Sequence, residues 1–293
     1  MKIYYPSYYS DFKCIADKCR HSCCVGWEIY VDGDTLDRYN DLSALDREKI
    51  LGCIGEDGCI SLSEGRRCPF LRRNGLCRII SDFGEMYTSD ICREHPRFYH
   101  RISDRVECGI GASCEVAAEL ILRGVGFADF IVSEGKCDIA DETDFDTLTH
   151  RNYIYSVILG KGTYSEKRDE IATKYAVKLP LDNTDKLNGA ISELEYLYDE
   201  HRSVMLLTSN RDAAPSDKLI GFFAYLIFRH VSIAEDERDL RSRVGFCILL
   251  TDLLASMIAS GGDPIDSARV ISEEIEYSED NTASLVFEID MEL

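Results

Sequence analysis

The sequence predicts a mainly α-helical protein in which a cysteine-rich, metal-bound N-terminal lobe of irregular α-helix and loops precedes an all-α helical bundle. Two observations lead to this prediction. Of the 13 cysteines in the 293-residue chain, 12 lie at or before Cys137. Beyond an acidic, polar stretch at 138–146, apolar residues recur at the spacing of helices that bury one face. We therefore expect a metal- or cluster-binding lobe at 1–137 and a helical C-terminal lobe at 138–293.

The N-terminal lobe is expected to hold two helices among glycine-interrupted loops. One is Asp34–Leu51 and the other is Ser113–Arg123. In the second segment the apolar residues share one face, and Glu115 falls in the first turn, where the helix dipole favours a negative charge.

The C-terminal lobe is expected to be a bundle of about five helices. Thr163 and Glu166 form a capping box, which begins a helix that ends near Ala176. The other four predicted helices are Thr184–Leu207, Ser216–Ile233, Asp236–Ser260 and Pro264–Tyr277. The third and fourth of the five are apolar over most of their circumference, which indicates central helices.

The charge balance limits the class of partner. The chain has 33 basic and 53 acidic residues, a net charge of −20. This field repels nucleic acid and anionic membranes and attracts cationic groups such as lysine side chains, although an acidic surface also serves solubility alone. The apolar run Val244–Ala259 is short for a membrane span and contains Asp252, so a buried core helix is expected. We expect a cytoplasmic protein with no membrane or nucleic-acid partner.

Because cytoplasmic thiols stay reduced, metal ligation is the leading explanation for the clustered cysteines. Thiolates bind zinc in sets of four and iron–sulfur clusters in sets of three or four. Inert buried thiols, a redox relay, and His21 or His95 as ligands are the alternatives. The eight candidate metal ligands are Cys14, Cys19, Cys23, Cys24, Cys68, Cys77, Cys92 and Cys114. They suffice for one or two centres, and Cys53, Cys59, Cys108, Cys137 and Cys247 are expected to be spare or packing thiols.

Ten ordered blocks of sequence carry a resemblance to a known family. They are Phe12–Cys14, Cys19, Cys23–Ile29 with Asp32, Cys68–Leu71, Gly75–Ile79, Gly84–Glu85, Cys92–Arg97, Ser113–Ala118, Phe222–Arg229 and Ile271–Asn281. With these blocks the chain resembles the flagellin lysine-N-methylase family and the wider group of zinc- or iron-chelating CxxxCC domains. It departs from the family pattern at Cys108–Ala112 and at Val116.

The resemblance implies a protein lysine N-methyltransferase. Such a protein transfers methyl groups from S-adenosylmethionine to lysine side chains of flagellin and carries an iron–sulfur cluster, with zinc as the alternative metal. The residues alone indicate a thiolate centre and an acidic body, and they identify neither a donor site nor the catalytic residues. The alternative is a non-catalytic zinc- or iron-binding module with a helical partner-binding lobe.

Three further residues are candidates for binding substrate or cofactor. The ring of Trp27 could line a cation or sulfonium pocket, or anchor the core of the metal lobe. Asp32 could orient an amine, or cap the helix expected from Asp34. Arg97 could clamp the carboxylate of the methyl donor, or pair within the acidic body.

Overall fold

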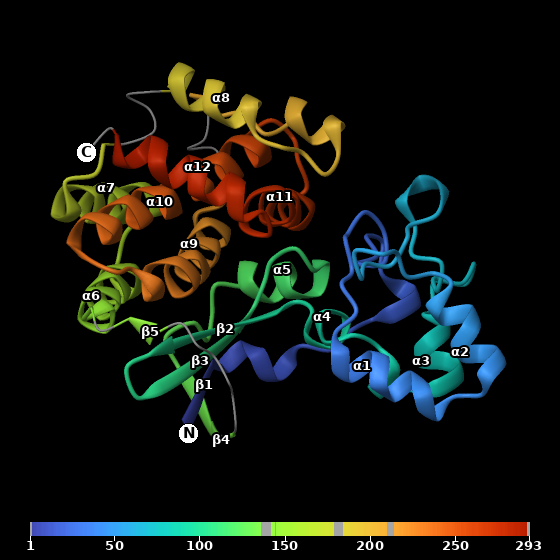
Figure 1. Ribbon diagram of the computed structural model, residues 1–293. Coiled ribbons are helices and arrows are strands. Elements are labelled where there is room, and N and C mark those ends of the chain that lie inside the picture. Colours follow the sequence, from blue (N-terminus) through green and yellow to red (C-terminus); the bar gives the residue numbers. More distant parts are fainter. Residues whose placement is uncertain (1, 136–141, 144, 179–183, 210–213, 292–293) are drawn as a thin grey trace. The chain divides into compact units, whose positions relative to one another are not determined.

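The computed structural model describes residues 2–135, 142–143, 145–178, 184–209 and 214–291 (Figure 1). Its contacts divide the chain into two compact units. One unit is Lys13–Pro96, and the other joins Met1–Phe12 to Arg97–Leu293. The boundary expected near 137 falls within the second unit, because that unit includes the first twelve residues and the segment after Pro96.

The Lys13–Pro96 unit consists of short helices and turns. Its α-helices are α1 (Gly33–Arg38), α2 (Ala44–Leu51), α3 (Arg78–Phe83) and α4 (Asp90–Glu94), with 3₁₀ turns at Ala16–Lys18, Tyr39–Asp41, Glu64–Arg66 and Glu85–Tyr87. A small core with Val31, Tyr39 and Phe70 at its centre holds them together. Irregular α-helix and loops are therefore what the structure has in this unit.

The helix expected over Asp34–Leu51 is broken in the structure. Tyr39–Asp41 tightens into a 3₁₀ turn, and Leu42 is extended. The Ser43 hydroxyl then accepts a hydrogen bond from the Asp46 N–H and begins α2. A serine cap inside an otherwise helical pattern thus divides one predicted helix into two.

The second unit contains a five-stranded sheet that the sequence did not predict. Its strands are β1 (Lys2–Pro6), β2 (Arg97–Ile102), β3 (Arg105–Ile110), β4 (Phe130–Glu134) and β5 (Glu142–Thr143), in the order β4-β1-β3-β2-β5. Strand β1 pairs in parallel with β3, Ile3 lying beside Val106. The alternation typical of a strand is hidden in β3, because Glu107 is as buried as its apolar neighbours and pairs with Arg151 of α6.

Helices make up most of the second unit. They are α5 (Glu115–Leu122), α6 (Thr147–Leu159), α7 (Tyr164–Tyr175), α8 (Thr184–Glu193), α9 (Ser216–His230), α10 (Glu237–Ala259), α11 (Pro264–Ile271) and α12 (Glu279–Asp290). A π-helical turn, Ser272–Glu276, continues α11, and 3₁₀ turns lie at Ser7–Asp11, Asp199–Ser203 and Val231–Ile233. Helix α10 contacts α9, α11 and α12 and forms the centre (Figure 1). The mainly α-helical fold is confirmed.

Helix α10 is long and apolar enough to cross a membrane, but 83% of its most apolar window is buried inside the protein. Asp252 in its middle is fully buried. Its carboxylate accepts hydrogen bonds from Arg168, at 3.3 Å, and from the Tyr164 hydroxyl, at 3.1 Å. The prediction of a buried core helix is confirmed.

The helix expected over Thr184–Leu207 ends early, at Glu193. Side chains from the C-terminal part of the chain accept hydrogen bonds from the backbone N–H groups that would otherwise have continued the helix. Asn281 Oδ1 accepts from Glu195 N at 3.0 Å, and Glu274 Oε2 accepts from Leu197 N at 2.6 Å. The capping box at Thr163, by contrast, is present as predicted.

Candidate functional site

The cysteine blocks of the Lys13–Pro96 unit are held by regular backbone contacts. Cys68 N donates to the Cys24 carbonyl at 2.9 Å. Cys77 occupies the N-cap position of α3, and Cys92 lies in α4. Three chain segments far apart in sequence therefore carry their thiols on short, anchored elements.

The thiols of this set interact electrostatically. Burial raises the pKa of Cys68 to about 12 and that of Cys92 to about 11, and in each case the neighbouring Cys24 adds to the rise. A hydrogen bond from the Cys23 thiol lowers the pKa of Cys24 to about 7. Cys77 also interacts with Cys24, and Cys14 with Cys23. Several sulfur donors around Cys24 are the chemistry that zinc and iron–sulfur clusters require.

Cys19 and Cys114 are two further predicted metal ligands, and Cys137 is a predicted spare thiol. Cys19 Sγ donates to the His21 carbonyl at 3.2 Å. Cys114 belongs to the other unit, where it occupies the N-cap position of α5. Cys137 lies outside the described residues.

Trp27 and Asp32 both have structural contacts within the Lys13–Pro96 unit. The Trp27 ring packs against the core of this unit and lies 6.2 Å from the His95 ring, centroid to centroid. Asp32 caps α1, because its Oδ1 accepts from Thr35 N at 2.9 Å. Its Oδ2 accepts from Asp90 N at 2.8 Å and so also anchors α4.

Arg97, the third candidate, lies in the other unit at the start of β2. Its Nε donates to the Tyr9 hydroxyl at 2.7 Å. The guanidinium carbon lies 5.9 Å from the Tyr9 ring centre and 5.6 Å from that of Phe12. These contacts tie β2 to the N-terminal segment.

The unit that contains Arg97–Leu293 has a pocket that the sequence did not predict. Its volume is about 730 Å³, and β2, α9, α10, the π-helical turn and α12 contribute to its lining. This volume lies within the range of roughly 300–1,000 Å³ typical of small-molecule sites. Four acidic residues of the lining come from α12 and the start of α10: Asp236, Asp239, Glu279 and Asp290.

Glu276 is the centre of the buried part of this pocket. Its Oε1 lies 2.8 Å from His230 Nε2 and 3.4 Å from Arg229 Nε. The Tyr225 hydroxyl donates to the same carboxylate at 3.0 Å and in turn accepts from Ala112 N. Glu276 is therefore fixed by one cation and two hydrogen-bonding side chains.

Arg229 is stacked between two rings beside this carboxylate. Its guanidinium carbon lies 4.8 Å from the ring centre of Phe98 and 4.6 Å from that of Tyr277. A side chain at Gly111 would collide with this arrangement, since a Cβ there would lie 2.3 Å from the Tyr277 hydroxyl. Gly111 therefore permits the close approach of the loop to Arg229 and Tyr277.

Substitution of Gly111 tests this packing. We expect Gly111→Ala to lower the free energy of unfolding by roughly 1–3 kcal/mol, the usual cost of overpacking. Gly189→Ala is the matched control, because Gly189 lies in α8 and a Cβ added there would meet no atom within 4 Å. It should raise stability by up to about 1 kcal/mol. Urea denaturation of both variants measures the difference, and equal stabilities would contradict the proposed packing.

Burial, more than the neighbouring charges, sets the protonation of the two pocket histidines. Burial alone would raise the pKa of Glu276, but Arg229 and the hydrogen bond from His230 outweigh it and lower that pKa. Burial lowers the pKa of His230. Burial, then the positive charge of Arg229, lowers the pKa of His100 to about 3. At neutral pH the pocket therefore holds an ionised carboxylate and two neutral imidazoles.

His100 contributes a buried ring nitrogen to the lining of the pocket. Its Nε2 is buried and has no hydrogen-bond partner among the residues that the structure describes. A neutral imidazole nitrogen that carries a lone pair accepts a hydrogen bond from an N–H group. His100 Nε2 is thus a hydrogen-bond acceptor, and its low pKa makes it a weak base.

Sequence reasoning did not single out Glu276, His230 or His100 as functional residues. The available signal was the resemblance itself, because Arg229 ends one of its C-terminal blocks and Glu276 lies in the other. In the structure these two blocks meet at the pocket, where the segment before Ser113 joins them. The spacing of residues within either block alone does not show that the two blocks contact each other.

Fold and site together define a mainly α-helical protein with a cysteine cluster in one unit and a pocket with a buried carboxylate and two histidines in the other. Known proteins with similar sequences carry the names expected from the cysteine blocks. Two proteins named lysine-N-methylase, from Salmonella choleraesuis and Salmonella typhimurium, are each 25% identical over 131 residues, which is 40% of this chain. The flagellar biosynthetic protein FliU of Salmonella muenchen is 25% identical over 131 residues, and the match covers 75% of that protein.

These relatives confirm the resemblance to lysine-N-methylases, over part of the chain. The match spans 32% of the length of each protein named lysine-N-methylase. No family model matches the chain, and no solved structure matches it.

Proposed function

We propose that the protein is a lysine N-methyltransferase that modifies flagellin in the cytoplasm. The observation that carries the proposal is the meeting of the Phe222–Arg229 and Ile271–Asn281 blocks at one pocket. Both blocks contribute to the resemblance, and the structure joins them through Arg229 and Glu276. The names of the three Salmonella relatives, which mention lysine methylation and the flagellum, support the same function.

The pocket can prepare a lysine side chain for reaction. The net charge of −20 attracts the ammonium group, and Asp236 and Glu279 of the lining supply carboxylates beside the ion pairs Arg238–Asp290 and Arg243–Asp239. Burial then disfavours the charged form and lowers the pKa of the lysine amine. The neutral imidazole of His230 accepts the proton, and Glu276, 2.8 Å from its Nε2, stabilises the positive charge that it gains, while His100 serves only as a hydrogen-bond acceptor.

The reaction itself is a displacement at carbon. S-adenosylmethionine supplies the methyl group when it is bound. The lone pair of the neutral lysine nitrogen forms the new nitrogen–carbon bond while the carbon–sulfur bond breaks, and the electron pair of that bond goes to sulfur. The nitrogen then loses a proton to an imidazole of the pocket. An acidic site also favours the cationic sulfonium over the neutral thioether product.

We infer that thiols of the Lys13–Pro96 unit hold a metal or an iron–sulfur cluster in this scheme. The candidate ligands are Cys23, Cys24, Cys68, Cys77 and Cys92, whose ionisations influence one another, with Cys14 as a further one. Lysine is a nucleophile once it is neutral, so the transfer needs no redox step. We infer that the bound metal stabilises the small core of the Lys13–Pro96 unit, in which Cys24 and Cys77 take part.

The direct test is incubation of the anaerobically purified protein with flagellin and S-adenosylmethionine labelled in its methyl group. The proposal expects label on lysine residues, located by mass spectrometry of flagellin peptides. A non-catalytic metal-binding module would leave flagellin unlabelled although its metal content is full. Unlabelled flagellin would contradict the proposed methyltransferase activity.

Metal content separates the cysteine cluster from the spare thiols. Because Cys24 interacts with the other thiols of the cluster, Cys24→Ala should lose most of the bound iron or zinc. Cys59→Ser is the matched control, since Cys59 belongs to the same unit and is expected to be a spare thiol. Elemental analysis and absorbance near 400 nm measure the outcome. Equal metal in both variants would contradict the assignment.

A further inference from the structure

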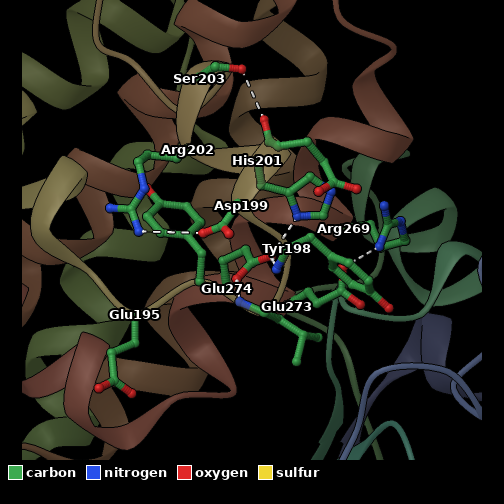
Figure 2. Close-up of polar contacts among 12 residues, drawn as sticks. Glu195, Tyr198, Asp199, His201, Arg202, Ser203, Arg269, Glu273 and Glu274 are labelled. Atoms are coloured by element: carbon green, nitrogen blue, oxygen red, sulfur yellow. Dashed lines mark hydrogen bonds and ion pairs between the residues drawn. The ribbon is translucent and has the colours of Figure 1, made fainter. Parts of the chain in front are cut away.

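A set of side chains with metal-ligand chemistry lies in the unit that contains Arg97–Leu293, and the proposal drawn from it is independent of the methylation proposal. Figure 2 shows His201 facing Glu274, with Glu273 beside it. One donor atom from each of these three residues lies within 4.8 Å of the others. We propose that His201, Glu273 and Glu274 bind a divalent transition-metal ion such as Zn²⁺.

The donor types favour this class of ion. One imidazole nitrogen with two carboxylate oxygens is typical of zinc and related first-row metals, whereas magnesium and calcium prefer oxygen ligands alone. His201 Nδ1 lies 2.6 Å from Glu274 Oε1. Ligand atoms around a tetrahedral zinc ion lie roughly 3 Å apart. A small rotation of the two side chains is enough to admit the ion, and the proton they share would leave.

The π-helical turn Ser272–Glu276 brings the two carboxylates together. A π-helical turn holds more residues than an α-helical turn, so successive side chains diverge by a smaller angle. Such turns are rare and occur frequently at functional sites. Both carboxylates are buried, Glu273 with 7% and Glu274 with 2% of its surface exposed. A pair of adjacent buried acids is costly without cations to balance it.

Surrounding groups already hold these carboxylates in place. Leu197 N and Tyr198 N donate to Glu274, at 2.6 and 3.2 Å. Arg269 pairs with Glu273 and balances one of the two negative charges (Figure 2). A bound cation would balance the other. Hydrogen bonds that orient ligating carboxylates in this way are typical of metal sites.

The test uses Co²⁺ as the probe, because its spectrum separates the two kinds of site. Cobalt bound to thiolates gives intense charge-transfer bands, and cobalt bound to nitrogen and oxygen gives weak visible bands alone. We expect the full-length protein to bind one equivalent of Co²⁺ through the weak bands, and His201→Ala to lose that equivalent while it keeps the thiolate bands. His150→Ala is the matched control, since His150 contacts Tyr175 at a different place.

Glu274→Gln provides a second variant if His201→Ala does not fold. It keeps an oxygen that can accept from Leu197 N and loses the charge that a metal requires. The proposal is overturned if wild-type protein shows only thiolate-bound cobalt, or if both variants bind as much Co²⁺ as wild type. Loss of flagellin methylation affects neither readout, so this site and the proposed activity can fail separately.

Discussion

Glu276→Gln should slow lysine methylation by roughly 10²- to 10⁴-fold, the usual contribution of acid–base catalysis. The substitution keeps the shape of the side chain and removes its charge. The charge holds Arg229 between two rings and fixes His230 through the 2.8 Å contact with its Nε2. Without it, an imidazole that takes up a proton is no longer stabilised. Initial rates with labelled S-adenosylmethionine and flagellin measure the effect.

Two controls separate this role from a loss of folding. Glu170→Gln changes an exposed carboxylate of α7 and should leave both the rate and the free energy of unfolding near the wild-type values. His230→Ala should be as slow as Glu276→Gln, and added imidazole should restore part of its activity. A folded Glu276→Gln variant with the wild-type rate would remove Glu276 from the proposed chemistry.

The parts of the fold that the sequence predicted depend on local interactions. The capping box at Thr163 and the apolar run of α10 are properties of a few neighbouring residues, and both appear as expected. The elements that the sequence predicted wrongly depend on side chains that are distant along the chain. The helix expected to reach Leu207 stops at Glu193, because side chains of residues 274 and 281 bind its continuation. The sheet was missed for the same reason, since buried Glu107 in β3 pairs with Arg151, 44 residues away, as well as with Arg105 of its own strand.

The candidate sites divide in the same way. Cysteines at short spacing predict a thiolate cluster from the sequence alone, which stays a prediction; in the structure Cys24, Cys77 and Cys92 each raise the pKa of Cys68. The pocket around Glu276 has no short motif, because its residues come from a strand, three helices and a π-helical turn. Residue spacing along one segment cannot express that geometry. Only the two C-terminal blocks of the resemblance pointed toward it.

Arg168→Met should lower the free energy of unfolding by about 3–5 kcal/mol, the usual cost of leaving one charge of a buried ion pair. Arg168 on α7 contacts the carboxylate of Asp252, which lies in the centre of the apolar helix α10 and is fully buried. Methionine fills most of the space of the arginine stem but brings no positive charge. Urea denaturation followed by circular dichroism measures the loss.

The double variant Arg168→Met/Asp252→Leu shows whether the loss comes from the buried charge. Replacing both partners by apolar residues is often neutral, so the double variant should recover most of the stability. Arg123→Met is the matched control, because Arg123 and Glu119 form an exposed pair on α5 whose side chains are 50% and 54% exposed. It should change stability by less than about 1 kcal/mol. Two outcomes would contradict this role of the ion pair. In the first, Arg168→Met and Arg123→Met lose the same stability. In the second, the double variant is no more stable than Arg168→Met.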